Sequence, residues 1–325
     1  MIREAVQMPP VDRDFSCIEG WRAADLVGEA PTRYGPMTFF RNDRGALTQS
    51  LQAYGEWAEH EITICGRFVQ AGDTVVDVGA YIGTHGLAFA QRVGPAGKVY
   101  SFEAQPASFA LLAHNLAAAE HGGIVTAVNA AVSHAGTGSS VLLDEIDITA
   151  PSSYGSAAIG AAHGGLHRVS VPTVTLDTLK LTTCALVKID VEGMEDQVLQ
   201  GAEQLLRSCG PVVYAECNAV DPGSRVAARL RAYGYEVWMH VCNAFNPQNW
   251  RAQQRNIFGD SKEVALVGVP PRHRITCQLL RAGVHESFFE IGTLDDLVAG
   301  MLLKPQYPRE VLRHTTAITA SGRSP

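Results

Sequence analysis

The stretch that decides the fold is TVVDVGAYIG, residues 74–83. Its first five residues are β-branched apart from one aspartate, which is typical of a buried strand. Gly79 and Gly83 then interrupt the run, and the pattern of residues 84–92 favours a helix. A strand, a glycine turn and a helix in this order begin a βαβ unit, so the stretch predicts an α/β fold with a parallel sheet.

Strand-like and helical patterns alternate along much of the remaining chain. Further strands are predicted at residues 98–102, 124–132, 185–189, 212–215, 235–241 and 263–269. Helices are predicted from Pro106 to the glycines at 122 and 123, over 197–209 and over 225–233. This gives seven strands, five in βα alternation and a final pair without an obvious helix between them. The pattern predicts a Rossmann-like, mostly parallel sheet with helices on both faces.

One region interrupts this alternation. Residues from about 136 to 175 hold two β-like runs, 141–148 and 168–174, around a Gly, Ala and Ser-rich loop at 152–165. Such a pattern predicts a β-hairpin inserted after the third strand. We therefore expect an N-terminal cap segment at 1–62, a core domain at 63–270 that carries the insertion, and a C-terminal extension at 271–325 that ends in a mobile tail.

Composition narrows the class of protein. The chain has 325 residues, a formal net charge of −7, 46% hydrophobic and 18% charged residues. The apolar share is that of a globular protein, and the acidic balance argues against one that binds nucleic-acid backbones. We expect no membrane span and no signal peptide, because no apolar stretch is long enough and residues 1–20 carry acids and prolines. Seven scattered cysteines without a CxxC pair favour reduced thiols in a cytoplasmic protein.

The first loop indicates the ligand class. Its glycine spacing is GxxxG, which differs from the GxGxxG that seats a dinucleotide, and the chain has no P-loop motif. Asp77 precedes the loop, where a carboxylate suits an ammonium group better than a pyrophosphate. Glu103 ends the second strand, where an acid commonly accepts hydrogen bonds from both ribose hydroxyls. S-adenosylmethionine, a nucleoside with a cationic amino acid, fits this description. The alternatives are that Asp77 caps the helix and Gly79 is a plain turn residue, or that the chain is a Rossmann dehydrogenase.

Further motifs make the resemblance specific. The chain contains VNAAVS at 128–133, TLDTL and LVKIDVEGMEDQVLQGA within 175–202, YAECN at 214–218 and NIFGD at 256–260. With VVDVGAYIG, these make residues 54–270 resemble the FkbM family of S-adenosylmethionine-dependent methyltransferases. The resemblance implies a class I methyltransferase fold, with seven strands and a reversed last strand, and O-methylation of sugar or polyketide-type hydroxyls. One departure is that the family's Glu-Pro after strand two reads Glu103-Ala104-Gln105-Pro106 here.

The resemblance also implies cofactor contacts. The loop would line the methionine portion, Asp77 would lie at its amino end, Glu103 would hold the ribose, and the third strand would lie against adenine. Glu56, in an N-terminal segment that the family folds over the cofactor, is a weaker candidate, with a solvated helix start as the alternative. The cofactor-binding residues expected are Glu56, Asp77, Gly79, Ala80, Tyr81, Gly83, Glu103, Gln105, Asn129, Ala130 and Asp190.

Carboxylates converge on the ligand edge of the predicted sheet. Asp190 ends the fourth strand, Glu192 follows it, and Glu216 ends the fifth, with Asn218 nearby. We expect Asp190 to face the sulfonium and the substrate, and Glu192 and Glu216 to bind substrate hydroxyls or to act as base. The alternative for Glu192 is a cap on the following helix. Such acids can also bind Mg²⁺, but carboxylates alone are not specific for it, and we predict no metal site.

Other residues are weaker candidates. His85 and His240 are rival bases, although a histidine is more often a surface or packing residue. Asn218, His240 and Trp250 are the predicted substrate-binding residues, and the loop at 243–260 that carries Trp250 would cover the substrate. Aromatic packing explains Trp250 equally well.

These observations predict an O-methyltransferase that acts on a hydroxyl of a small molecule, sugar or natural product by in-line displacement. The alternatives are a catalytically inactive nucleoside-binding scaffold, and a methyltransferase for a peptide or nucleic acid. We expect a small-molecule or glycan substrate and neither a nucleic-acid nor a membrane partner. The sequence leaves the oligomeric state open, a homodimer included.

Overall fold

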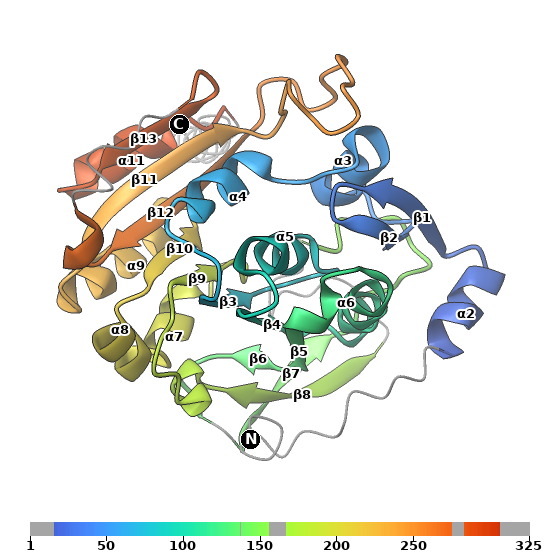
Figure 1. The fold of residues 1–325 in the computed structure, drawn as a ribbon, viewed down its shortest axis with the longest axis horizontal. Coiled ribbons are helices and arrows are strands. Elements are labelled where there is room, and N and C mark those ends of the chain that lie inside the picture. The colour runs from blue at the N-terminus through green and yellow to red at the C-terminus, as the bar shows by residue number, and fades with distance from the viewer. Residues whose placement is uncertain (1–15, 137, 156–166, 275–282, 306–325) are drawn as a thin grey trace, which may run out of the picture.

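A computed structural model describes residues 16–136, 138–155, 167–274 and 283–305. Its centre is an eight-stranded sheet with the order β13-β11-β12-β10-β9-β3-β4-β5 (Figure 1). The strands are β3 (Thr74–Val78), β4 (Lys98–Glu103), β5 (Val125–Asn129), β9 (Leu186–Ile189), β10 (Val212–Glu216), β11 (Glu236–Asn243), β12 (Lys262–Val269) and β13 (Glu286–Glu290). The strand that contains Asp77 lies in the interior of this sheet, as its apolar sequence predicts.

The topology is that of a class I methyltransferase. β3 pairs in parallel with both β4 and β9, so the chain leaves β3 toward one edge and later returns on its other side. This reversal of strand order is the switch point at which open α/β sheets bind ligands. β12 runs antiparallel to β10 and β11, which confirms the reversed last strand of the expected seven.

The sheet has one more strand than predicted. β13 comes from the region expected to be a C-terminal extension, and it pairs antiparallel with β11 at the sheet edge. Its Phe288 ring stacks on Trp238, with ring centroids 5.2 Å apart and an interplanar angle of 11°. Five residues isolated between loops give a weak periodic signal, so the pairing depends on the exposed edge that β11 offers.

Helices cover both faces of the sheet (Figure 1). One face carries α4 (Glu59–Gly66), α5 (Thr84–Val93) and α6 (Pro106–Ala118), and the other carries α7 (Glu195–Gln200), α8 (Glu203–Cys209), α9 (Val220–Ala232) and α11 (Leu294–Met301). Neighbouring residues of a strand face opposite layers, so Val75 joins one hydrophobic cluster and Val76 the other. The described part of the chain contains no helix with the length and apolar character of a membrane span.

The helix predicted over 197–209 is wrong in one respect. The chain forms two helices, α7 and α8, which are separated by Gly201 and Ala202. The break has a tertiary cause, because Gly201 packs against the backbone of the chain after β5. A Cβ at Gly201 would lie 2.5 Å from the carbonyl oxygen of Ser133. The carboxylate of Asp177 then accepts the Gln204 and Leu205 N–H groups at 3.1 and 2.8 Å, which starts α8.

The segment before the sheet packs on α6. It contains α2 (Ser16–Ala23), the hairpin of β1 (Val27–Thr32) and β2 (Gly35–Phe40), and α3 (Ala46–Tyr54). The buried Asn115 of α6 holds this hairpin, because it donates to Thr38 O at 3.0 Å and accepts from Thr38 N at 2.7 Å. The same amide donates to Ile82 O at 2.9 Å, so one side chain links the N-terminal segment to the loop after β3.

The insertion forms a second, small sheet. β6 (Ala131–Val132), β8 (Arg168–Val174) and β7 (Ser140–Asp144) pair in that order, and β7 and β8 are antiparallel. β7 ends before the predicted residue 148, and most of the predicted loop tip, 156–166, lies outside the described residues, as does the tail at 306–325. The return segment reaches the N-terminal segment, where Asp43 bridges to Ser152.

Replacing Gly201 with alanine should reduce the free energy of unfolding by about 1–3 kcal/mol, because the new methyl group meets backbone that has little room to move. Urea denaturation measures the change. Gly123→Ala is the matched control, since nothing lies within 4 Å of a Cβ there. An unchanged midpoint for Gly201→Ala would contradict this account of the break.

Candidate active site

A cavity of about 370 Å³ opens at the carboxyl ends of β3, β4, β9 and β10. This size is in the range of small-molecule and cofactor sites. Trp57 from the N-terminal segment and Tyr154 from the insertion complete its wall. The predicted site residues that line it are Gly79, Ala80, Tyr81, His85, Glu103, Gln105, Ala130, Asp190, Glu192, Glu216 and Asn218.

The glycine loop holds its shape through backbone contacts that exclude a side chain. Gly79 has φ +82°, and a Cβ there would lie 1.7 Å from the carbonyl oxygen of Asp190. The N–H groups of Gly79 and Ala80 both donate to Phe102 O at 2.9 Å. The loop is therefore packed between the ends of β4 and β9, and the ligand edge of β3 stays open.

Glu103 presents a buried carboxylate at one end of this cavity. It accepts hydrogen bonds from Tyr81 N at 2.8 Å and Gln105 N at 2.7 Å. Burial raises the pKa of Glu103 to about 7, although these two N–H donors act to lower it. A ligand that donates hydroxyl hydrogens would satisfy the remaining lone pairs and favour the ionised form. This is the chemistry of a ribose, so the residue fits the expected nucleoside.

Lys188 forms the electrostatic centre of the site, and the sequence analysis missed it. Its side chain is 3% exposed, and its Nζ lies 3.1 Å from Asp190 Oδ2 and 3.8 Å from Asp77 Oδ1. Burial acts to raise the pKa of Asp190, but the Lys188 ammonium outweighs it and holds that pKa below its usual value. The sequence does contain a signal for this residue: a lysine stands inside the otherwise apolar strand LVKI. A charged side chain in a buried strand needs a partner of opposite charge.

Three carboxyl groups lie together beside Lys188. Single oxygen atoms of Asp190, Glu192 and Glu216 are all within 4.8 Å of one another. Burial first, and the Asp190 charge second, raise the pKa of Glu192 to about 7 and that of Glu216 well above its usual value. The three carboxyls therefore titrate as a group, in which the pKa shifts favour the ionised form of Asp190 and the protonated form of Glu216.

Although this spacing would also suit a metal ion, the cation beside Asp190 is Lys188. We treat the three acids as a proton-sharing group, and the absence of a metal site stays a prediction.

Glu192 has a left-handed backbone conformation, with φ +51°. It does not cap α7, whose N-cap residue is Met194, so the alternative role considered for it is not the one in this structure. A non-glycine residue in this region costs free energy, and it turns the Glu192 side chain to the cavity.

Several predicted residues do not line the cavity. Asp77 is completely buried beneath the loop against Lys188, so it does not reach a cofactor's amino end directly. Asn129 donates to Glu103 O and Ala104 O at 2.8 and 3.1 Å, which shapes the chain after β4. His240 is 0% exposed and contacts Tyr214 and Glu286, whereas Trp250 is 45% exposed on the surface. The structure therefore does not bring His240 or Trp250 to the predicted substrate site, and Gly83 likewise starts α5 outside the cavity lining.

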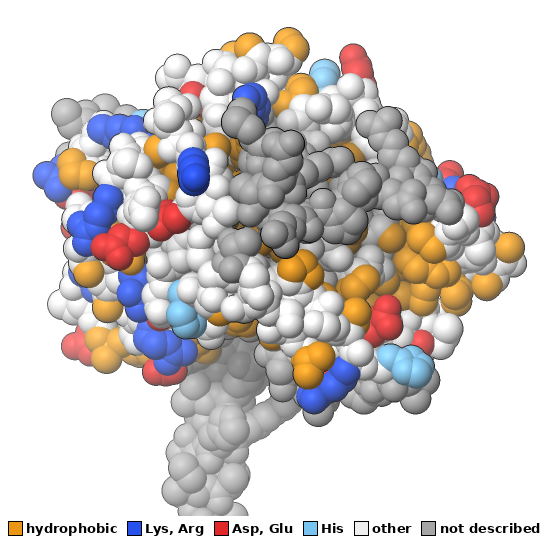
Figure 2. Space-filling view, turned by 90° about the horizontal axis from the view of Figure 1, so that it is seen from below, with side chains coloured by type: hydrophobic (Ala, Val, Ile, Leu, Met, Phe, Trp, Pro, Cys, Tyr) orange, Lys and Arg blue, Asp and Glu red, His pale blue; other side chains and the backbone are white. Residues whose placement is uncertain are grey.

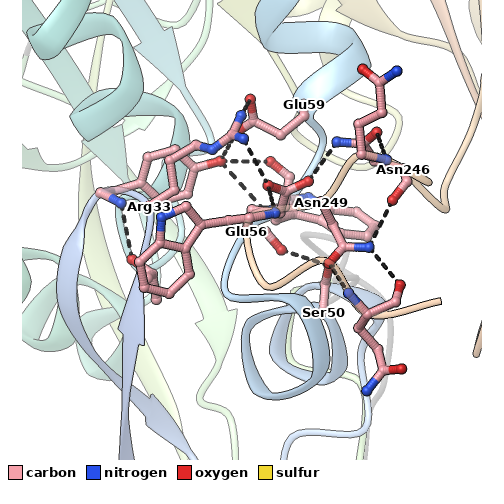
Figure 3. A network of polar contacts seen from close by, with 12 residues as sticks. Arg33, Ser50, Glu56, Glu59, Asn246 and Asn249 are labelled. Atoms are coloured by element: carbon pink, nitrogen blue, oxygen red, sulfur yellow. Dashed lines mark hydrogen bonds and ion pairs between the residues drawn. The ribbon is translucent and has the colours of Figure 1, made fainter. Parts of the chain in front are cut away.

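Glu56 holds the loop between β11 and β12 rather than the cavity. Its carboxylate accepts from Asn246 Nδ2 and from Trp250 N, both at 2.7 Å, and pairs with Arg33 at 3.3 Å. Figure 3 shows Glu56 between Arg33 on one side and Asn246 and Asn249 on the other. The next residue, Trp57, lines the cavity, so this network fixes a wall of the site. A residue can thus serve a site without touching it.

His85 and Asn218 lie where the sequence suggests. Burial lowers the pKa of His85 to about 4, so its imidazole is neutral, and its Nε2 has no hydrogen-bond partner. Asn218 accepts from Lys304 Nζ at 2.7 Å. Glu61 and Glu263, which were not predicted, lie in a smaller cavity directly behind Asp190. Neither lies within a recognised motif, although Glu263 follows NIFGD by three residues, and the fold brings both to this cavity.

Comparison with known proteins agrees with this geometry. Residues 77–237 match the family model described as the methyltransferase FkbM domain. The chain carries an FkbM methyltransferase domain. The FkbM domain spans β3 to β11, and so contains the glycine loop, Glu103 and the Asp190 group. It has the S-adenosylmethionine-dependent class I methyltransferase fold.

Solved structures similar to the chain are remote in sequence. A putative rRNA-methylase from Clostridium thermocellum is 13% identical, with 66% of this chain and 96% of that chain covered and a TM-score of 0.41. Methyltransferase FkbM from Methylobacillus flagellatus is 12% identical, with 69% and 58% covered and a TM-score of 0.38. An S-adenosylmethionine-dependent O-methyltransferase from Thermotoga maritima is 13% identical, with 75% and 77% covered and a TM-score of 0.37. No curated protein matches the chain.

Replacing Glu56 with alanine should lower the free energy of unfolding by about 2–4 kcal/mol, because three buried or half-buried donors lose their acceptor. Chemical denaturation measures this loss. Glu29→Ala removes an exposed ion pair with Arg22 and should cause no measurable change. If both variants unfolded at the wild-type midpoint, the Glu56 network would not hold the wall of the site.

Proposed function

We propose that the protein is an S-adenosylmethionine-dependent O-methyltransferase that acts on a hydroxyl of a small molecule or glycan. The proposal depends mainly on one observation: three carboxyl groups, those of Asp190, Glu192 and Glu216, lie together in a cavity that Glu103 and the glycine loop also line. When bound, the cofactor supplies a methyl group on a sulfonium. Transfer of that methyl to an alcohol also requires that the alcohol lose a proton.

The residues divide these tasks. Glu103 would bind the ribose, the loop at Gly79 and Ala80 would border the methionine portion, and Gln105 and Ala130 would lie near the nucleoside. Asp190, held ionised by Lys188, would face the positive charge. Glu192 or Glu216 would accept the proton from the substrate hydroxyl, since both line the same cavity. Placing donor and acceptor in contact would supply much of the rate enhancement.

The charge of the cavity supports a substrate without phosphate groups. Its acidic side chains are Asp43, Glu103, Asp190, Glu192, Glu216 and Glu263, whereas Lys188 and the neutral His85 are the basic ones among the described residues that line it. The face seen in Figure 2 carries basic side chains mixed with acidic ones and no continuous basic stripe. Both features favour a small molecule over a nucleic acid. A cytoplasmic location is part of the proposal, supported by the free cysteines among the described residues.

Calorimetry tests the cofactor. S-adenosylmethionine and S-adenosylhomocysteine should each bind with a micromolar-range Kd, and absence of both heats would contradict the proposal. Methyl transfer is then measured as release of S-adenosylhomocysteine over a panel of sugars, polyols and phenols.

In turnover of a panel substrate, Asp190→Asn and Glu216→Gln should each lower kcat by about 100-fold or more. The matched control, Glu203→Gln, alters an exposed carboxylate that pairs with Arg207, and it should retain wild-type kcat. Near-normal turnover in both site variants would show that the acid group is structural.

The affinity for S-adenosylhomocysteine should depend on pH through Glu103. Because the pKa of this group is about 7 in the free protein and ribose hydroxyls favour its ionised form, binding should strengthen by about tenfold from pH 6 to pH 8. Glu103→Gln should bind more weakly and lose this part of the pH dependence. A pH profile identical in the variant and the wild type would exclude Glu103 as the ribose ligand.

A further inference from the structure

A second, smaller cavity lies behind the active site. It has a volume of about 40 Å³ and touches Asp190, Glu216 and Lys188 on one side. Its other walls include Glu61, His85, Tyr214, Glu263 and Trp57. Two buried atoms of these walls, Glu216 Oε2 and His85 Nε2, have no hydrogen-bond partner in the protein. A polar space of this size can hold ordered water that links them.

From this cavity a chain of hydrogen bonds leads away through the sheet. Tyr214 Oη lies 2.9 Å from His240 Nδ1, and His240 Nε2 lies 3.1 Å from Glu286 Oε2. The other oxygen of Glu286 lies 3.1 Å from Nδ1 of His60, whose side chain is 16% exposed. The four residues come from β10, β11, β13 and α4, and none of them belongs to the catalytic group proposed above.

The donors and acceptors along this chain have a consistent direction. When a neutral His240 donates from Nε2, the Tyr214 hydroxyl donates to Nδ1, and the Tyr214 oxygen keeps a lone pair. The opposite nitrogen of His240 donates to the Glu286 carboxylate, so the neutral imidazole carries its proton on Nε2. A protonated His240 would lie between a hydroxyl and a carboxylate, which is the environment that stabilises an imidazolium.

The proposed chemistry needs a group that can accept the proton of Glu216. A protonated Glu216 cannot act as a base, and its Oε2 atom is buried without a hydrogen-bond partner in a residue that borders the small cavity. A sulfonium bound in the main cavity would favour ionisation of the neighbouring carboxyls, and the proton of Glu216 would then need an acceptor inside the protein.

We propose that the Tyr214–His240–Glu286 chain takes this proton and thereby ionises Glu216 when S-adenosylmethionine fills the site. The proposal rests on the function proposed above.

The proton transfer balances without any further reagent. The O–H bond of the Glu216 carboxyl breaks, and its proton passes through water in the small cavity to Tyr214 Oη. The former Tyr214 proton moves to His240 Nδ1, and His240 becomes an imidazolium next to the Glu286 carboxylate. Glu216, now ionised, is ready to accept the proton of the substrate hydroxyl. Tyr214 and His240 are positioning residues, because they act on the reaction through Glu216.

The charged groups around His240 come from several elements. Glu286 of β13 and Tyr214 of β10 contact it directly, Glu61 of α4 lies near enough for an electrostatic interaction with it, and His60 of α4 contacts the other oxygen of Glu286. Beyond Tyr214, the small cavity adds Lys188, Asp190, Glu216, Glu263 and His85. Acids predominate in this set. If the contacts of His240 with Tyr214 and Glu286 only joined β13 to the sheet, the protonation of His240 would not change when the cofactor binds.

Histidine side-chain NMR provides the test. The ¹⁵N signals of His240 are assigned with His240→Gln and compared at pH 7.5 in the free protein, with S-adenosylhomocysteine and with S-adenosylmethionine. These two ligands differ in the methyl group and its positive charge. We expect the neutral Nε2–H form in the first two states and protonation of both nitrogens in the third. Tyr214→Phe should abolish this change while binding of S-adenosylmethionine persists.

Control variants separate the relay from general packing effects. Tyr235→Phe also removes a buried hydroxyl, one that donates to Leu206 O at 3.0 Å, and should leave the His240 response intact. Glu286→Gln keeps a hydrogen-bond acceptor without charge and should reduce the response. An unchanged His240 signal in the wild-type protein with bound S-adenosylmethionine would overturn the relay and leave the methyltransferase proposal standing. Failure of both ligands to bind would overturn both proposals.

Discussion

The ion pairs of the buried Lys188 with the buried Asp77 and the partly exposed Asp190 are the interactions on which the site depends. Asp77 and Lys188 are register partners on β3 and β9, the two strands at the switch point of the sheet. The buried Lys188 ammonium needs the carboxylates as partners, and the carboxylates need the ammonium. Removal of either side alone would leave an uncompensated charge. The ion pairs therefore fix the ligand edge of the sheet and the position of Asp190 together.

That charge also determines how the remaining acids behave. Lys188 stabilises one carboxylate, and burial, followed by the Asp190 charge, raises the pKa values of Glu192 and Glu216. Similar side chains in one cavity consequently differ in protonation, which is how environment separates acid from base in an active site. The elements around them complete this arrangement, because the N-terminal segment contributes Trp57 and Glu61, and the added strand β13 contributes Glu286.

Local patterns predicted the features that local physics controls. The β-branched run at Thr74–Val78, the glycine loop and Glu103 at the end of β4 lie where the sequence indicated, because strand periodicity and glycine turns are short-range properties. The split between α7 and α8 was missed because its cause is the backbone at Ser133, far away in the chain. Likewise, the prediction of His240 as a substrate ligand is wrong because its position after apolar residues gives no information on what packs beyond β11, where Glu286 of β13 contacts it.

The sequence by itself determined the α/β alternation, the class of the fold and the acids that end the strands of the sheet. Parallel strands bring their carboxyl ends to one edge, so Asp190 and Glu216 had to meet once the strands formed. Only the tertiary structure decided which acid is ionised, which residues close the cavity, and how Glu56, Tyr214 and His240 connect to it. Protonation and burial depend on neighbours supplied by distant segments, and a local sequence pattern carries no record of those neighbours.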